Sequence, residues 1–307
     1  MQTLPKCLLL PIDGTNESLR PAKFLSRLYP PSEVRLILCY FSTPPPPAYC
    51  GAVAQSRELL AKKRQFFEKR KRDERRVFDQ ALEALAKEGF SKEFIQEHVE
   101  QKNMGTAKQA CLLGDIRKVD AIVVQKQVKT RLAHLMSADP SSALVQQCIE
   151  CPIWMTDGEI DPGKAAIYII DEEASLRIAD HAGYMLSDTG VDIALIRAAS
   201  KTSHPLSCRP SEAVRELSNY ADAHQLSYLL RASAILADYG IAENRIRITL
   251  IPERGGAVTA ILSWCAANGI GIIGLGRTRT EGVRGFLKTS ATQKITSDFK
   301  NMAVWVA

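Results

Sequence analysis

Short apolar runs alternate along the chain with longer segments of helical periodicity. In the first half, buried strands are predicted at 6–13, 33–41, 94–101, 120–125 and 151–155. Helical patterns fall between these strands, at 17–29, within 52–89, at 105–119 and at 140–148. Strands that alternate with helices indicate a parallel sheet with helices on both faces.

The same order returns after the linker "TDGEIDPGK" at 156–164. Strands are predicted at 165–171, 191–198, 245–253, 270–275 and 302–307. Trp154 and Trp305 take the same place in the last strand of each half, and Asp171 takes the place of Asp13 after the first strand. The chain is therefore predicted to be a duplication with a period of roughly 150 residues, giving domains at 1–158 and 162–307.

Each domain is predicted to be a doubly wound α/β fold, with a five-stranded parallel sheet of order 3-2-1-4-5 and four helices. In such a sheet the connections reverse direction between strands 1 and 4, and ligands bind at the carboxyl ends of these strands. The stretch "GLGRTRTEGVRGFLKTS", at 274–290, begins where strand 4 of the second domain ends. The sequence therefore favours a ligand site there.

Composition narrows the class of protein without specifying its chemistry. The 307 residues are 46% apolar and 24% charged, with a net charge of +6, which is typical of an ordinary globular protein. No apolar run is long enough for a membrane span, and the N-terminus lacks the pattern of a signal peptide, so a cytoplasmic protein is predicted. The eight cysteines are then expected to be reduced thiols. Cys148 and Cys151 have the spacing of a redox or metal half-site, but no second pair completes a metal site.

Three stretches carry a resemblance to a known family: "PIDGTNES" at 11–18, "STPPPP" at 42–47 and "SSALVQQCIECPIWM" at 141–155. With their second-half counterparts, they make the whole chain resemble the universal stress protein family in its tandem, two-domain form. The resemblance implies a Rossmann-like fold of the adenine nucleotide alpha hydrolase type. It also implies pairing of the last strands, here 151–155 with 302–307, in an intramolecular pseudo-dimer. Further assembly into a homodimer stays open.

Nucleotide-binding members of that family resemble one another in a phosphate loop, Gly-x2-Gly-x9-Gly-[Ser/Thr], and in an Asp after strand 1. In the second domain the resemblance puts Gly276 at the first glycine, Arg279 at the second, and Thr289 and Ser290 at the final pair. The candidate site for ATP or AMP is therefore, in full: Asp171, Gly274, Gly276, Arg277, Arg279, Thr289 and Ser290. The alternative is a solvated basic loop whose following helix is capped by Ser290 and Gln293, and this alternative is slightly favoured.

The first-domain loop contains no glycine. Lys126, Lys129 and Asp139 stand at the three glycine positions. Asp139 followed by Pro140 is a strong helix start, and a carboxylate there would repel a phosphate. The first-domain site, including Asp13, is therefore predicted to be inactive, with Asp13 explained as a turn former.

A basic helix is predicted over 57–76, ahead of the apolar spacing that resumes at Val77. Nine basic and three acidic residues lie between Lys62 and Arg76. This part of the helix is expected to project from the core. A solvated helix with ion pairs four residues apart, such as Glu68 with Arg72, is favoured over a docking surface for an acidic partner or for nucleic acid.

No enzyme signature is found in the sequence: the five histidines are isolated, and no nucleophile elbow, zinc motif or complete P-loop occurs. The sequence and the resemblance predict a non-catalytic stress-response protein that binds a protein partner and needs no metal, membrane or nucleic acid. The alternatives are a sensor of ATP or AMP that uses the 274–290 loop, and a slow nucleotide hydrolase.

Overall fold

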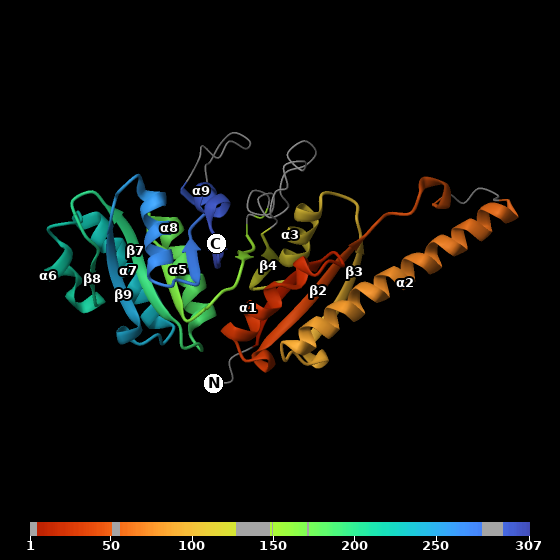
Figure 1. The fold of residues 1–307 in the computed structure, drawn as a ribbon, viewed down its shortest axis with the longest axis horizontal. Helices are drawn as coiled ribbons and strands as arrows, with labels where there is room; N and C mark the ends of the chain where they lie inside the picture. The colour runs from red at the N-terminus through yellow and green to blue at the C-terminus, as the bar shows by residue number, and fades with distance from the viewer. Residues whose placement is uncertain (1–4, 51–55, 127–147, 149, 171, 278–290) are drawn as a thin grey trace.

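The computed structural model describes residues 5–50, 56–126, 148, 150–170, 172–277 and 291–307. Within these residues, eleven strands form one continuous sheet (Figure 1). Their order is β3-β2-β1-β4-β5-β11-β10-β6-β7-β9-β8. None of the described helices is both long enough and apolar enough to span a membrane.

The first half of the sheet has the predicted order 3-2-1-4-5, and neighbouring strands are parallel. Its strands are β1 (Lys6–Ile12), β2 (Val34–Ser42), β3 (Ile95–Gln101), β4 (Ala121–Gln125) and β5 (Ile153–Asp157). Its helices are α1 (Pro21–Leu28), α2 (Arg57–Lys87) and α3 (Thr106–Arg117). The helix predicted at 140–148 lies outside the described residues, except for Cys148.

The second half repeats this order and adds one strand. Its strands are β6 (Lys164–Tyr168), β7 (Asp192–Ala199), β8 (Leu206–Cys208), β9 (Ile246–Pro252), β10 (Ile272–Leu275) and β11 (Met302–Val306). Its helices are α5 (Glu172–Leu186), α6 (Ala213–Leu217), α7 (Ala223–Asp238), α8 (Ala257–Ala267) and α9 (Ala291–Asp298). Strand β8 pairs antiparallel with β9 and was not predicted, because three residues are too few to show an alternating pattern.

Two apolar layers hold the helices on the sheet. Leu8 and Leu10 of β1 point into the layer beneath α1, α2, α5 and α7. Leu9 points into the opposite layer, beneath α3, α8 and α9. This alternation follows from the two-residue period of a strand buried on both faces. The predicted doubly wound α/β class is confirmed.

The two halves join where β5 and β11 pair antiparallel. Trp154 lies opposite Trp305 in this pairing, and the two buried indoles stack with ring centroids 3.9 Å apart and planes 3° apart. His181 of α5 lies edge-on to both rings and accepts a hydrogen bond from the indole N–H of Trp154 at 2.9 Å. The predicted intramolecular pseudo-dimer through the last strands is confirmed, and we call this junction the seam.

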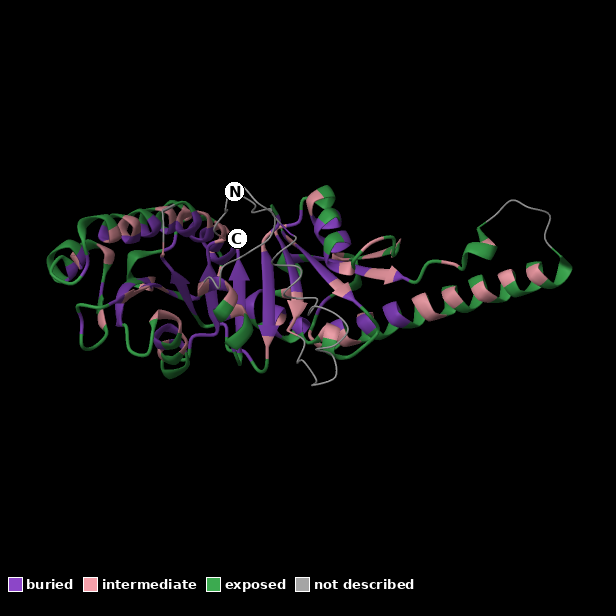
Figure 2. Ribbon diagram, turned by 90° about the horizontal axis from the view of Figure 1, so that it is seen from above, coloured by how far each residue is buried: buried purple, intermediate pink, exposed green. Residues whose placement is uncertain are grey.

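Helix α2 begins far from the core, as predicted, and Figure 2 shows its first half extending away from the sheet with mostly exposed residues. Its buried residues start at Val77. Residues 57–76 carry ten basic and four acidic side chains, so their net charge equals the +6 of the whole chain. Ion pairs four residues apart do form, at Lys62–Glu58, Arg70–Glu74 and Arg75–Asp79. Among the ion pairs of the described residues of α2, the expected pair between Glu68 and Arg72 does not occur.

Candidate functional site

The strand registers show which residues of the two halves are equivalent. Ile122 of β4 and Ile273 of β10 each pair with the residue that precedes the seam tryptophan. Leu9 of β1 pairs with Ile122, and Ala166 of β6 pairs with Ile273. Leu9 and Ala166 are therefore equivalent, and the first strands of the two halves differ by 157 in residue number.

By this register, the residue of the second domain that is equivalent to Asp13 is not the expected Asp171. Counting on from β1 and β6, Asp13 corresponds to Ile170. A repeated hydrogen bond supports this correspondence: Asp13 N–H donates to Ser18 Oγ at 3.4 Å, and Ile170 N–H donates to Ser175 Oγ at 2.9 Å. The expected equivalence of Asp13 and Asp171 is thus wrong by one residue, and Asp171 itself lies outside the described residues.

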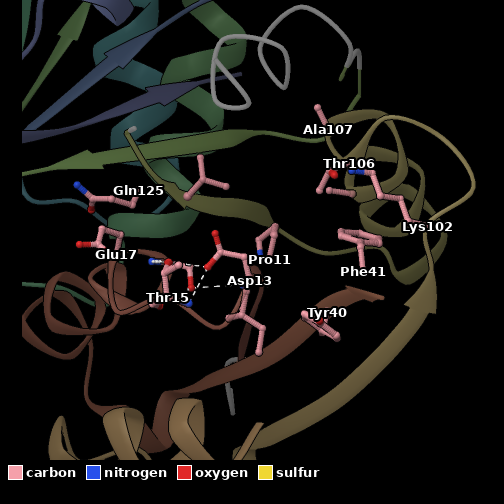
Figure 3. Close-up of a pocket in the computed structure, with 14 residues that line it drawn as sticks. Pro11, Asp13, Thr15, Glu17, Tyr40, Phe41, Lys102, Thr106, Ala107 and Gln125 are labelled. Atoms are coloured by element: carbon pink, nitrogen blue, oxygen red, sulfur yellow. Dashed lines mark hydrogen bonds between the residues drawn. The ribbon is translucent and has the colours of Figure 1, made fainter. Parts of the chain in front are cut away.

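A cavity of about 350 Å³ opens at the carboxyl ends of β1, β2 and β4, the switch point of the first domain (Figure 3). Its lining combines apolar and aromatic side chains with polar and charged ones. The lining residues are Pro11, Ile12, Asp13, Thr15, Glu17, Ser18, Tyr40, Phe41, Lys102, Thr106, Ala107, Ala110, Val124 and Gln125. A concave apolar site with a few polar groups is the usual form of a small-molecule pocket.

Asp13 is held in place at one end of this cavity. Gly14, with φ of +84°, turns the chain so that Thr15 donates both its N–H, at 2.9 Å, and its hydroxyl, at 2.6 Å, to Asp13 Oδ1. Burial would raise the pKa of the Asp13 carboxyl, but the hydrogen bonds from Thr15 and Ser18 outweigh burial and lower it. The carboxylate is therefore ionised at neutral pH and remains an acceptor for ligand hydroxyl or amino groups.

The opposite end of the cavity is positive. Lys102 follows β3, and among the described residues its ammonium group forms no ion pair. Beside it lies Thr106, the first residue of α3, in a helix whose N-cap is Gly105 and whose first N–H groups receive no side-chain cap. A helix N-terminus with an adjacent lysine attracts an anion. Lys102 and Tyr40 were missed by the sequence reasoning, because no motif connects these loop and strand-end positions with Asp13.

In the second domain, an arginine lies at the position that corresponds to Tyr40. By the same registers, Tyr40 of β2 corresponds to Arg197 of β7. Arg197 Nη1 donates to the carbonyls of Ile169 and Ile170, at 3.1 and 2.8 Å, and so lies across the end of β6. A separate cavity of about 430 Å³ lies beside Arg197, at the ends of β6, β7 and β9, and Lys201 is among its lining residues.

Gly274 and Gly276 have a structural role in this domain. A Cβ atom on Gly274 would lie 2.9 Å from Ile178 Cγ1, and one on Gly276 would overlap the carbonyl of Ala174. Both glycines therefore let β10 and the residue after it approach α5 closely, which explains them without a phosphate. Of the other predicted positions, Arg279, Thr289, Ser290, Lys129 and Asp139 lie outside the described residues.

The two remaining predicted positions, Lys126 and Arg277, reach across the seam. Lys126 Nζ donates to the carbonyls of Ser297 and Phe299, at 2.8 and 2.7 Å, behind the end of α9. The guanidinium of Arg277 donates to the carbonyl of Cys148 in the first domain. Each cation is thus bonded to backbone of the other domain.

The expectation of reduced cysteines is wrong for one pair, because a disulfide joins Cys111 of α3 to Cys148. Sequence spacing pointed instead to Cys148 and Cys151, and only the packing of α3 reveals Cys111. Cys151 is not disulfide-bonded and is buried, and burial raises the pKa of its thiol to about 12. Among the described residues, no group of three or more His, Cys, Asp or Glu side chains could hold a metal ion.

No protein-family model and no curated protein sequence matches the chain. Solved structures do match over its whole length. A universal stress protein from Archaeoglobus fulgidus is 11% identical, with a TM-score of 0.61, covering 99% of this chain and 98% of that one. A protein of unknown function from Pseudomonas aeruginosa is 14% identical, with a TM-score of 0.53, covering 98% and 92%. The chain therefore has the fold of a tandem universal stress protein.

Proposed function

We propose that the chain is a non-catalytic tandem universal stress protein that binds a small anionic ligand, of the size of a nucleoside monophosphate, in its first domain. The first-domain cavity carries this proposal. It has an ordered carboxylate, Asp13, at one end and a cation, Lys102, beside a helix N-terminus at the other. The full-length likeness to a universal stress protein supports the assignment to that family.

An adenine nucleotide has groups that match both ends of the cavity. A base or ribose can lie against the lining side chains of Tyr40 and Phe41, while its hydroxyl or amino groups donate to Asp13. The phosphate then lies at Lys102 and the first turn of α3. The cavity of about 350 Å³ is at the small end of ligand pockets, which favours AMP over ATP.

The proposed absence of catalysis rests on the state of Asp13. Its carboxylate already accepts two hydrogen bonds from Thr15, and its pKa is lowered. A carboxylate stabilised in its ionised form is a weak general base. We therefore expect a bound nucleotide to dissociate without being hydrolysed.

Thermal unfolding with and without millimolar AMP, ATP and Mg²⁺ tests the proposal. A ligand at about 100 times its Kd stabilises by about 2.7 kcal/mol, which moves the midpoint by a few degrees. We expect AMP to produce this shift in the wild type and in Lys201→Met, which alters the second-domain cavity. We expect Lys102→Met to lose the shift.

Two outcomes would contradict the proposal. A shift that survives Lys102→Met but is lost in Arg277→Ala/Arg279→Ala would favour the 274–290 loop as the nucleotide site. The absence of any shift with any nucleotide would remove ligand binding altogether. Chromatography of the incubated nucleotide tests the non-catalytic part: product above a buffer blank, lost in Asp13→Asn, would instead indicate a slow hydrolase.

A further inference from the structure

Two cations cross the seam from equivalent positions. The N–H of Lys126 donates to the carbonyl of Thr156 at 2.8 Å, and the N–H of Arg277 donates to the carbonyl of Ala307 at 2.7 Å. Thr156 and Ala307 each lie two residues after the seam tryptophan of their own domain. Lys126 and Arg277 therefore start from the same point in the two domains.

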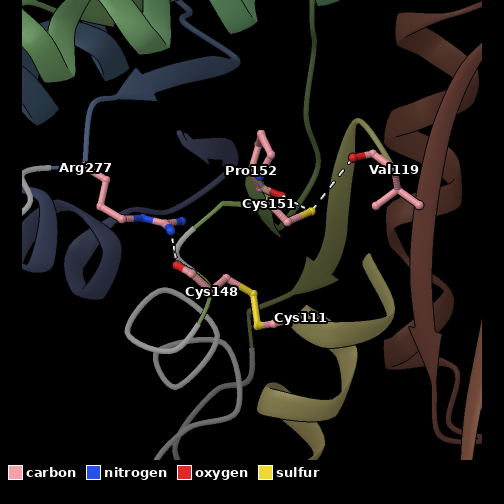
Figure 4. Close-up of a disulfide and its surroundings, with 6 residues drawn as sticks. All are labelled: Cys111, Val119, Cys148, Cys151, Pro152 and Arg277. Carbon is pink, nitrogen blue, oxygen red and sulfur yellow. Dashed lines mark hydrogen bonds between the residues drawn. A yellow bond between two sulfur atoms is a disulfide. The ribbon is translucent and has the colours of Figure 1, made fainter. Parts of the chain in front are cut away.

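Their acceptors across the seam are also equivalent. Lys126 donates to the carbonyl of Phe299, and Arg277 donates to the carbonyl of Cys148 (Figure 4). Phe299 and Cys148 each lie six residues before the seam tryptophan of their domain. Each domain thus donates a hydrogen bond to the equivalent backbone carbonyl of the other domain, and the two contacts form a reciprocal pair.

The side chains at these two acceptor positions differ in chemistry. Phe299 lies in an apolar cluster together with Leu262 of α8. At the matching place in the first domain, Cys148 is bonded to Cys111 of α3. Cys111 and Leu262 correspond, because each lies six residues after the glycine N-cap of its helix. A covalent bond in the first domain therefore takes the place of two apolar side chains at the equivalent positions of the second.

We propose that the Cys111–Cys148 disulfide is a redox site for a dithiol reductant. Its oxidation state controls the strength of the hydrogen bond from Arg277 to the carbonyl of Cys148 in the first domain. In the oxidised protein the disulfide fixes Cys148 to α3, and the carbonyl that accepts from Arg277 is held in place. Reduction frees Cys148 and weakens this contact. The reciprocal contact of Lys126 is to Phe299, which cannot form a disulfide, and does not respond.

The reaction is a thiol–disulfide exchange between the protein and an external dithiol. One thiolate of the dithiol attacks a sulfur of the Cys111–Cys148 bond, forming a mixed disulfide and releasing one protein thiolate. The second thiol of the reagent then displaces the other protein sulfur. The protein gains two electrons and two protons, and the dithiol becomes a disulfide.

Cys151 is not the thiol that opens this bond. Its Sγ would lie 3.2 Å from a Cβ atom at Gly114, and it faces the carbonyl of Val119, so it is packed against α3 and the start of β4 (Figure 4). Burial also keeps it protonated at neutral pH, and only a thiolate attacks a disulfide. The reducing thiol must therefore come from another molecule.

The first measurement counts thiols in the purified, denatured protein. Of its eight cysteines, six remain reactive if the disulfide is present. The second measures the rate at which phenylglyoxal modifies Arg277 in the native protein, with and without dithiothreitol, by peptide mass spectrometry. Arg245 is the internal reference, because it donates to the carbonyl of Val191 away from the disulfide. We expect reduction to speed labelling of Arg277 about tenfold, the effect of one charge-assisted hydrogen bond, and to leave Arg245 unchanged.

Three variants separate redox control from damage to the fold. Cys111→Ser should label quickly at Arg277 without reductant, and Cys265→Ser, which removes a buried thiol of the second domain, should behave like the wild type. The double variant Cys111→Leu/Cys148→Phe installs the two apolar side chains found at the equivalent positions of the second domain. It should fold and label slowly at Arg277 in either redox condition, so it keeps the test valid if Cys111→Ser does not fold.

Any of three results would overturn the proposal. Eight reactive thiols in protein purified without reductant would show that the bond does not form. Resistance of the native protein to dithiothreitol would show that the bond is inaccessible to a dithiol. Unchanged labelling of Arg277 after complete reduction would show that the disulfide does not affect the hydrogen bond from Arg277 to Cys148 across the seam.

Discussion

Protonation of His181 should weaken the seam between the two domains. His181 Nε2 accepts the indole N–H of Trp154 at 2.9 Å, and the ring lies edge-on to both stacked tryptophans. An indole N–H only donates, so Nε2 carries no proton in the folded protein. Burial, and secondarily the positive charge of Lys6, lower the pKa of His181 from 6.5 to about 3.

The sign and size of the effect follow from proton linkage. Between pH 6.5 and about 3 the unfolded chain binds a proton at this histidine and the folded chain does not. The contribution of His181 to stability is therefore complete above pH 6.5 and is lost as the pH falls. Lowering the pH from 7 to 5 should cost about 2 kcal/mol. His181 keeps some solvent exposure, so this value is an upper limit.

Urea unfolding at pH 7, 6 and 5, followed by tryptophan fluorescence, measures this loss. The wild type should lose about 2 kcal/mol more than His181→Gln between pH 7 and pH 5, because glutamine cannot titrate. His224→Gln is the matched control, since His224 is an exposed histidine of α7 that contacts Tyr228 and lies outside the seam. Carboxylates elsewhere titrate alike in all three proteins, so the difference isolates His181.

Equal losses in the wild type and in His181→Gln would refute the reasoning. Such a result would mean that the folded protein accepts the proton at His181 without disturbing the bond from Trp154. A loss that disappears in His224→Gln would assign the pH response to α7 instead of the seam.

Three further substitutions, and one control, test the packing and the disulfide. Trp305→Ala should lower the free energy of unfolding by about 3–5 kcal/mol, because it removes one of the two stacked, buried indoles; urea titration measures this. Gly276→Ala should cost about 1–3 kcal/mol because its Cβ would overlap the backbone of α5, whereas Gly190→Ala, with no atom within 4 Å of the new Cβ, should be neutral in thermal unfolding. Cys148→Ser opens a loop of 37 residues and should cost up to about 4 kcal/mol without reductant, a difference that should vanish in dithiothreitol.

The fold was predictable because its signals are local and repeated. Apolar runs marked the parallel strands, the turn residues marked the linker, and the return of Trp154 as Trp305 indicated the duplication. The projection of α2 was also predictable, because its apolar spacing begins only at Val77. Strand β8 was not predictable, since three residues carry no period.

The candidate site was less predictable, because it depends on which residues meet at the ends of different strands. Matching the two aspartates made Asp171 the equivalent of Asp13, but the strand registers show that Ile170 is the equivalent residue. The sequence could not show that Arg197 takes the position of Tyr40 in the second domain and donates to the carbonyls at the end of β6. The second-domain positions outside the described residues stay predictions.

The sequence by itself determined most of the secondary structure and the strand order within each half, because these follow from the periodic burial of apolar side chains and from the handedness of parallel crossovers. The pairing of the two halves was implied by the family resemblance. Only the tertiary structure decided where a cavity opens, that Cys148 bonds to Cys111, and that Lys126 and Arg277 hold the opposite domain. These contacts join residues that are far apart in the chain. They depend on side-chain volume and backbone register at a point where several elements meet, and no local pattern in the sequence records that combination.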